Sequence, residues 1–403
     1  MIASAQLPRA RSVSYKWRRF DPRGDGPRFP LLPDLLHPVT TPRFTPAGSL
    51  GRAFSRITTH QAALDSLLRE RLYGLGTSAW FPALGPDECA ALDRALTEAR
   101  LRETVRIAVR EEHWLEAMDA LHRHGISAIA LKGFALARAL YDTPSQRPSL
   151  DMDVIVDIND VPRIHELMPT IGWSLPYGVR GQYTSHQFTW AKGDEGPTRA
   201  LIDFHWRITN RPALSRFLTH NHLHERATTR EINGRHVTLV HPIDALLHAV
   251  IHIVAHHRGD AIPALWYVDI ALLEASLRPD ERVTFVRNLA ANGISSIAAK
   301  IWRDAHEIIG FEPHPETRWL LHSHDARRDL WQQIPENRGS EIIADLMALR
   351  VEDRLHYLRE LLLPNERSLR IAFGDQASDT PLWQLRLRRI VQGGVRRSPK
   401  KGP

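Results

Sequence analysis

Apolar residues recur at three- and four-residue spacing over two early segments, which predicts helices there. The first segment begins near His60 and ends in glycines ("HQAALDSLLRERLYGLG"), and the second covers residues 87–124. Residues 1–55 show no sustained period and are rich in proline and arginine. We therefore expect residues 1–55 to be a disordered or loosely packed tail, and residues 56–124 to be an N-terminal helical segment.

The pattern changes over residues 125–210, where short apolar runs alternate with helical stretches. The runs "ISAIALK" and "MDVIVD" are typical of buried strands, and the short helical stretch "GFALARALY" separates them. The helical stretch "DVPRIHELMPTIG" follows, and two alternating segments joined by "KGDEGPTR" then predict a hairpin. Together these elements predict a sheet of at least four strands.

Beyond residue 211 the pattern is almost wholly helical, as in "PIDALLHAVIHIVAHH" and "PALWYVDIALLEASL". We expect a helical domain over residues 211–365, followed by a basic tail over residues 366–403. The predicted fold class is α+β, with a small mixed-sheet core at residues 125–210, flanking helices, and a mostly helical domain after it.

Composition narrows the class of protein. The chain has 403 residues, of which 43% are hydrophobic and 25% charged, and no apolar run approaches the ~18 residues of a membrane span. The single cysteine, Cys89, excludes an intramolecular disulfide and a cysteine-based zinc site, which fits the cytoplasm. The formal charge of +7 supports nucleic acid as a partner only weakly, because it equally suits a phosphorylated ligand or a solvated surface.

Two aspartates, Asp151 and Asp153, stand one residue apart at the start of the second predicted strand. Side chains alternate across a strand, so both project from one face. Carboxylates this close repel each other unless a cation lies between them or one of them is protonated. Because Mg²⁺ is usually bound by one or two carboxylates, water and substrate phosphates, the pair is a candidate site for Mg²⁺ or Mn²⁺; a solvated strand end is the alternative.

Residues before and after this pair extend the candidate site. Lys132 and Gly133 lead from a strand directly into a helix, whose N-terminus favours a phosphate; Lys132 alternatively forms an ion pair with the aspartates. Arg147, in a proline-stiffened loop, would reach a phosphate or brace Asp151. Asp203 interrupts another apolar strand, and His205, on the same face, is expected to orient it.

Histidines mark one predicted helix. His248, His252 and His256 share a face of this helix, and Asp269 lies in the next one. Such a set is compatible with a transition metal, as in metal-dependent phosphohydrolases. Because the face includes no glutamate base, we interpret His252, His256 and Asp269 as structural or supporting residues, with contact to a nucleobase as the alternative for the histidines.

The joint pattern resembles that of the uncharacterised nucleotidyltransferases in the DNA polymerase β-like superfamily. The shared residues of the first part are Lys132, Gly133, Leu136, Tyr141, Arg147, Pro148, Asp151 and Asp153. An aspartate-x-histidine-tryptophan strand follows at Asp203, His205 and Trp206, with "HIVAHH" and "WYVDIA" after it. The resemblance covers roughly residues 60–360.

This resemblance implies transfer of a nucleoside monophosphate from an NTP to an acceptor. Asp151 and Asp153 would hold two Mg²⁺ ions, and Asp203 would complete the metal that activates the acceptor hydroxyl. The wider superfamily has a serine after the glycine, whereas Phe134 follows Gly133 here, so the role of that serine is vacant. The acceptor, whether small molecule, sugar, protein or RNA end, and the oligomeric state stay open. The alternatives are a phosphohydrolase built on the histidine helix and an inactive nucleotide-binding module.

Overall fold

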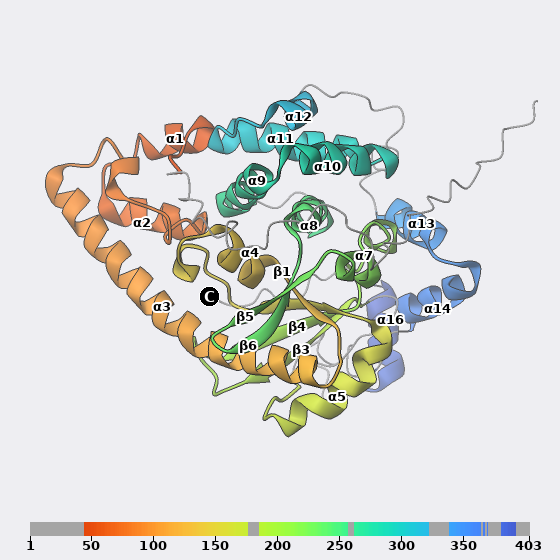
Figure 1. Ribbon diagram of the computed structural model, residues 1–403. Coiled ribbons are helices and arrows are strands. Elements are labelled where there is room, and N and C mark those ends of the chain that lie inside the picture. Colours follow the sequence, from red (N-terminus) through yellow and green to blue (C-terminus); the bar gives the residue numbers. More distant parts are fainter. Residues whose placement is uncertain are drawn as a thin grey trace, which may run out of the picture. The chain divides into compact units, whose positions relative to one another are not determined.

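The structure is a computed structural model and describes residues 44–175, 185–256, 262–321, 338–363, 366, 369 and 380–391 (Figure 1). Within these residues six strands form one mixed sheet in the order β3-β4-β2-β1-β6-β5. The strands are β1 (Ala128–Leu131), β2 (Met152–Val156), β3 (Gln187–Lys192), β4 (Ala200–His205), β5 (Thr228–Ile232) and β6 (Arg235–Leu239). The predicted mixed sheet of at least four strands is confirmed.

The central strands β1 and β2 are buried at every position. Strands covered on both faces read as continuous apolar runs, which explains the unbroken "AIAL" and the apolar "VIV" of β2. β1 pairs with β2 in antiparallel and with β6 in parallel orientation, while β2 and β4 are parallel. The expected hairpin is formed by the antiparallel strands β3 and β4.

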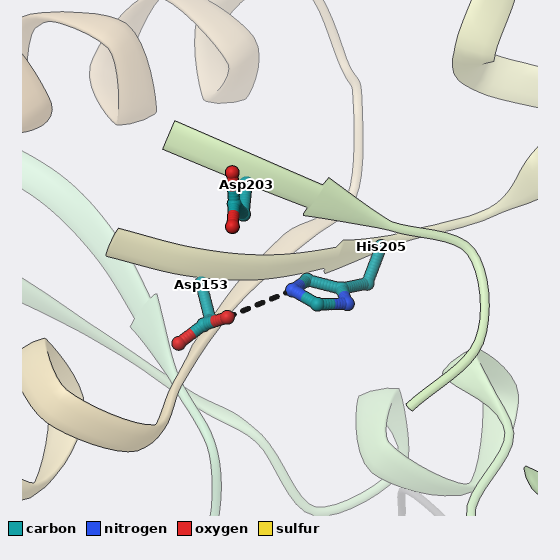
Figure 2. Close-up of side chains that lie close together, drawn as sticks. All are labelled: Asp153, Asp203 and His205. Atoms are coloured by element: carbon teal, nitrogen blue, oxygen red, sulfur yellow. Dashed lines mark hydrogen bonds and ion pairs between the residues drawn. The ribbon is translucent and has the colours of Figure 1, made fainter. Parts of the chain in front are cut away.

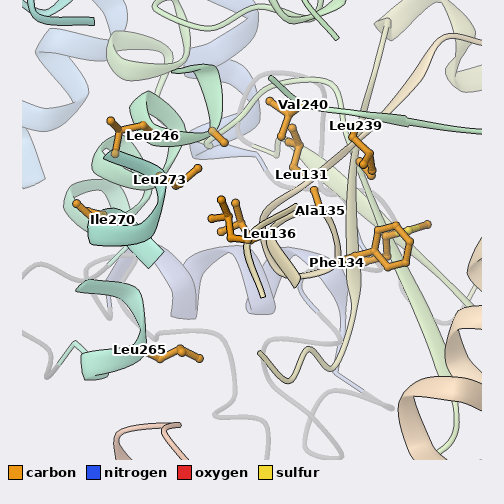
Figure 3. Close-up of a cluster of buried hydrophobic side chains, with 14 of the residues drawn as sticks. Leu131, Phe134, Ala135, Leu136, Leu239, Val240, Leu246, Leu265, Ile270 and Leu273 are labelled. Atoms are coloured by element: carbon orange, nitrogen blue, oxygen red, sulfur yellow. The ribbon is translucent and has the colours of Figure 1, made fainter. Parts of the chain in front are cut away.

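Helices before and within the sheet region hold its strands. The long helix α3 (Pro86–Arg123) contacts β6 and β4, and the indole Nε1 of its Trp114 donates to the carbonyl of Leu201 at 2.9 Å. Helix α4 (Lys132–Leu140) starts directly after β1 and contacts β1, β2 and α9. Apolar side chains from α4, β6, α8 and α9 gather in the same cluster (Figure 3). The site therefore rests on elements that share a core.

Several of the remaining helices coincide with segments whose apolar spacing predicts a helix. The helices that begin before residue 319 are α1 (Gly48–Phe54), α2 (His60–Arg69), α5 (Val161–Thr170), α6 (Pro212–Ser215), α7 (His220–His224), α8 (Pro242–His256), α9 (Ala264–Ser276), α10 (Pro279–Ala291), α11 (Ser295–Ile309) and α12 (Pro315–Arg318). The C-terminal ones are α13 (Arg338–Ala348), α14 (Val351–Leu362) and α16 (Leu382–Val391), and short 3-10 turns include η3 (Pro144–Gln146) and η5 (Trp319–Leu321). No helix among the described residues is long and apolar enough to cross a membrane.

Two segments differ from the prediction. The region expected to be helical from residue 211 contains the hairpin β5–β6, whose turn is Asn233-Gly234, a dipeptide typical of tight hairpins. Residues 48–54, expected in a loose tail, form helix α1 instead, because Leu50 and Phe54 are buried against the core. Residues 1–43 of that tail lie outside the described residues, and the other domain boundaries stay predictions.

Candidate functional site

Asp153 and Asp203 lie side by side on the neighbouring parallel strands β2 and β4. They are register partners, so their side chains leave the sheet from the same face. His205 shares this face, and its Nε2 lies 2.8 Å from Oδ1 of Asp153 (Figure 2). One ligand atom from each of these three residues lies within 4.8 Å of the others. The prediction that His205 orients Asp203 is wrong, because its hydrogen bond goes to Asp153 on the next strand.

Asp153 is held in its charged form by two neighbours. Lys132 Nζ donates to Oδ1 of Asp153 at 2.9 Å, the same oxygen that His205 contacts. Burial raises the pKa of the Asp153 carboxyl, but the charge of Lys132 and the hydrogen bond with His205 outweigh burial and hold this pKa well below its usual range. Lys132 thus forms the ion pair that the sequence left as an alternative to phosphate binding.

Asp203 is oriented by neutral donors from the edge strand β3. Gln187 Nε2 donates to Oδ2 of Asp203 at 2.8 Å, and the Thr189 hydroxyl donates to Oδ1. Thr189 is the register partner of Asp203, and Gln187 lies two residues earlier on the same face. Sequence reasoning missed both residues, although the alternation of "HQFTWA" places them on one face of a strand.

A tight turn between β1 and α4 delivers Lys132 to the aspartates. Lys132 has φ 45°, in the left-handed region that few residues other than glycine adopt. A Cβ on the adjacent Gly133 would lie 2.3 Å from Ser149 Oγ and 2.8 Å from Arg147 Nη1. The loop after η3 therefore packs so closely on the start of α4 that a Cβ at position 133 would force the loop to shift. The fold also places a serine, Ser149, beside Gly133, although the sequence order has none at that position.

Arg147 has a partner that neither sequence-based alternative named. Its Nη2 and Nε donate to the two carboxylate oxygens of Asp269 at 2.7 and 3.3 Å, and the Tyr141 hydroxyl donates to the same carboxylate at 2.6 Å. All three side chains are buried. Burial, together with the charge of Asp269, raises the pKa of Tyr141 well above its usual value. The cluster fixes the loop that leads to Asp151 against helix α9.

A cavity of about 870 Å³ opens over this face of the sheet. Lys132, Asp151, Asp153, Gln187 and Asp203 line it, together with Trp266 and histidines from α8. Asp151 precedes β2 and reaches the same cavity, but it is not among the three residues whose ligand atoms gather within 4.8 Å. The volume is in the range that binds small-molecule ligands and cofactors.

Histidines of α8 face the cavity without forming a metal centre in the described part of the chain. His248 and His252 line the cavity, and the ring of His252 packs edge-to-face on Trp266 with centroids 5.0 Å apart. Among the described side chains, which do not include that of His256, the ligand atoms of His248 and His252 do not gather with those of Asp269 into a compact set of three. Asp269 accepts hydrogen bonds from Arg147 and Tyr141, and its structural role stays a prediction.

The family model described as "Uncharacterised nucleotidyltransferase" matches residues 60–310. The chain belongs to this family. The match confirms the resemblance seen in the sequence and includes every residue of the site described above. Membership gives the chain a general nucleotidyltransferase role, which makes it a transferase.

Two further comparisons complete the picture of its relatives. No curated protein matches this family member significantly. Among solved structures, it is similar to the crystal structure of an antigenic nucleotidyltransferase-like protein from Paracoccidioides brasiliensis, with 17% identity and a TM-score of 0.28. That alignment covers 48% of this chain and 88% of the other. The likeness is too remote to bear on the site.

Proposed function

We propose that this nucleotidyltransferase moves a nucleoside monophosphate from an NTP to an acceptor in the presence of Mg²⁺ or Mn²⁺. The observation that carries the proposal is the register pairing of Asp153 with Asp203 on the wall of a ligand-sized cavity. Lys132 offsets the charge of Asp153, whereas Asp203 has neutral donors only, so the pair keeps a net negative charge that favours a further cation.

The donor set suits a hard divalent cation. Asp153 and Asp203 would hold it through carboxylate oxygens, the ligands that Mg²⁺ prefers, with Asp151 nearby on the same cavity wall. Oδ1 of Asp153 is engaged by Lys132 and His205, while Oδ2 accepts no hydrogen bond from the described residues. Bound there, Mg²⁺ would neutralise charge on the phosphates and on the attacking oxygen.

The charge of the cavity explains why a cation is needed. Among the described residues that line it, three side chains are cationic and four are carboxylates. Two of the cations, Lys132 and Arg147, are already paired with Asp153 and Asp269. A bare triphosphate would therefore meet net repulsion, and a metal-bound triphosphate would be accepted.

The protein's own groups would position the reactants. Lys132 keeps Asp153 ionised, and Gln187 with Thr189 fixes the orientation of Asp203. In this proposal an acceptor hydroxyl approaches Asp203, whose carboxylate takes the proton as the oxygen attacks the α-phosphate. The bond from the α-phosphorus to the oxygen bridging to the β-phosphate breaks, and pyrophosphate leaves. The peptide groups at the start of α4 face a phosphate of the nucleotide. The acceptor is a hydroxyl or phosphate group on a small molecule, sugar, protein or RNA.

An NTP screen tests the proposal. The purified protein is incubated with each α-³²P-labelled NTP, Mg²⁺ or Mn²⁺, and fractionated cell extract, and label is sought on the protein itself and on extract components. We expect metal-dependent labelling that is lost in Asp203→Asn and kept in Asp194→Asn, an exposed aspartate in the β3–β4 turn. Tight NTP binding without label on any fraction would instead indicate the inactive binding module.

A further inference from the structure

Backbone strain singles out a residue that the proposed site does not yet include. Among the described residues, three that are not glycine have a left-handed φ, namely Arg71 (57°), Lys132 (45°) and Asn233 (52°). Asn233 precedes Gly234 in the β5–β6 hairpin, where this conformation is expected. The other two both line the cavity over the aspartates. Strain at a cavity wall suggests a function for the side chain that it presents.

Arg71 occupies the position after helix α2 that is usually glycine. The Arg71 N–H donates to the carbonyl of Leu68 at 3.1 Å, and the Leu72 N–H donates to that of Leu67 at 2.7 Å. This pair of bonds defines the Schellman motif, in which the residue at Arg71 adopts the left-handed conformation. Leu67 and Leu72 are fully buried, as the motif favours. A glycine at this position would end the helix equally well and with less backbone strain. The arginine is therefore not explained by the helix end.

The turn is fixed on both sides. The Glu70 side chain accepts from the Ala264 N–H at 3.0 Å, and the Glu70 carbonyl accepts from the Leu265 N–H at 3.3 Å, which ties the turn to the start of α9. A Cβ on Gly74 would lie 2.5 Å from the carbonyl oxygen of Ser145, so the turn also packs tightly on η3. Arg71 thus projects from a backbone that cannot easily relax.

Among the described residues that line the cavity, Arg71 is the one cationic residue whose side chain has no carboxylate partner. Lys132 and Arg147 form ion pairs, whereas Arg71 forms no hydrogen bond or ion pair through its side chain with any described residue. An exposed guanidinium presents up to five donors in a fork that matches phosphate geometry. We propose that Arg71 binds a phosphate group of the nucleotide, an inference that rests on the proposed nucleotidyl transfer.

Calorimetric titration with Mg²⁺-tripolyphosphate and with Mg²⁺-ATP tests this role, with adenosine as the probe for contacts to the nucleoside. Arg71→Gln should weaken binding of both phosphate compounds by roughly 10- to 100-fold, the usual effect of losing a charged hydrogen-bonded contact, and should leave adenosine binding unchanged. Arg230→Gln, an exposed arginine of β5 outside the cavity lining, controls for the change in net charge.

Arg71→Gly separates binding from stability. It should weaken tripolyphosphate binding as much as Arg71→Gln does, and it should keep or raise the melting temperature, by about 1–3 °C, because glycine relieves the strain. Wild-type affinity in both Arg71 variants would overturn the proposed role of Arg71 and would leave the proposed nucleotidyl transfer standing. If the variants lost affinity for ATP but not for tripolyphosphate, Arg71 would contact the nucleoside, and its phosphate-binding role would be overturned as well. If the wild-type protein binds neither compound, the proposed function fails together with this inference.

Discussion

Asp153 and Asp203 face the same cavity from register-paired positions, yet their immediate partners differ in charge. Asp153 accepts hydrogen bonds from a lysine and a histidine, and Asp203 accepts them from a glutamine and a threonine. Replacing Asp203 by a neutral residue leaves no unpaired charge, because its donors are neutral. Replacing Asp153 in the same way leaves the Lys132 ammonium without its partner. The two aspartates should therefore respond differently to the same substitution.

Asp203→Asn should abolish turnover and spare the fold. The amide of Gln187 can turn to accept from the new asparagine, so the free energy of unfolding should change by less than about 1 kcal/mol. The loss of a charged ligand should lower metal-dependent turnover by about 10²- to 10⁴-fold. Urea unfolding and α-³²P transfer measure the two effects, and Mn²⁺ binding followed by electron paramagnetic resonance should weaken in parallel. Normal Mn²⁺ binding in this variant would remove Asp203 from the metal site.

Asp153→Asn should cost stability, about 1–3 kcal/mol, because it leaves the largely buried Lys132 ammonium without its partner. Lys132→Met should cost a similar amount, since it leaves Asp153 charged beside His205 only. The double variant should lose clearly less than the sum of the two single losses, because each single change removes the same interaction. Urea unfolding of all four proteins gives the coupling energy. Strictly additive losses would show that the ion pair contributes nothing to folding.

Sequence periodicity could predict β1, β2 and the shared face of the aspartates because these are local properties of a strand. Viewed from the sequence, Asp151 and Asp153 are two repelling carboxylates, and relief of that repulsion would make Asp153→Asn harmless. The folded protein reverses this expectation, because Lys132 of α4 and His205 of β4 both contact Oδ1 of Asp153. Asp153→Asn therefore removes favourable contacts. Periodicity reports which face a side chain occupies and does not report its partners.

Long-range partners could not be predicted for the same reason. Nothing near Arg147 in the sequence indicates Asp269, because their pairing depends on how α9 packs on α4. The place of Ser149 beside Gly133 likewise follows from the path of a loop. By contrast, the hairpin β5–β6 could have been predicted from the Asn233-Gly234 dipeptide at its turn. It was missed because the surrounding segments have a helical pattern.

The Arg147–Asp269 pair should be a major structural contact. Arg147→Met should lower the free energy of unfolding by about 3–5 kcal/mol, because it leaves the buried Asp269 carboxylate without its cationic partner. Tyr141→Phe removes one neutral donor and should lower it by about 1–2 kcal/mol. The exposed pair Arg278–Asp280 provides the control, and Arg278→Met should cost less than about 1 kcal/mol. Guanidinium chloride unfolding measures all three. Equal effects for Arg147→Met and Arg278→Met would contradict the inferred role of burial.

Gly133→Ala should disturb the site through the loop that packs on it. The new methyl group would lie within 3 Å of Ser149 Oγ and Arg147 Nη1, and the guanidinium cannot move away without breaking its bond to Asp269. The loop must shift instead, which should cost about 1–3 kcal/mol of stability and lower turnover by displacing Asp151.

A second substitution distinguishes this clash from a simple helix effect. Alanine is a better helix former than glycine, so without the clash Gly133→Ala would stabilise α4. Adding Ser149→Gly removes both serine atoms nearest the methyl group and should recover part of the lost stability and turnover. Gly85→Ala, where a Cβ meets nothing within 4 Å, changes only the N-cap of α3, so it should cost less than about 1 kcal/mol and leave turnover unchanged in the same thermal and transfer assays. If Gly133→Ala proved as harmless as Gly85→Ala, the close contact between the loop and the start of α4 would be wrong, and with it the fixed position of Asp151.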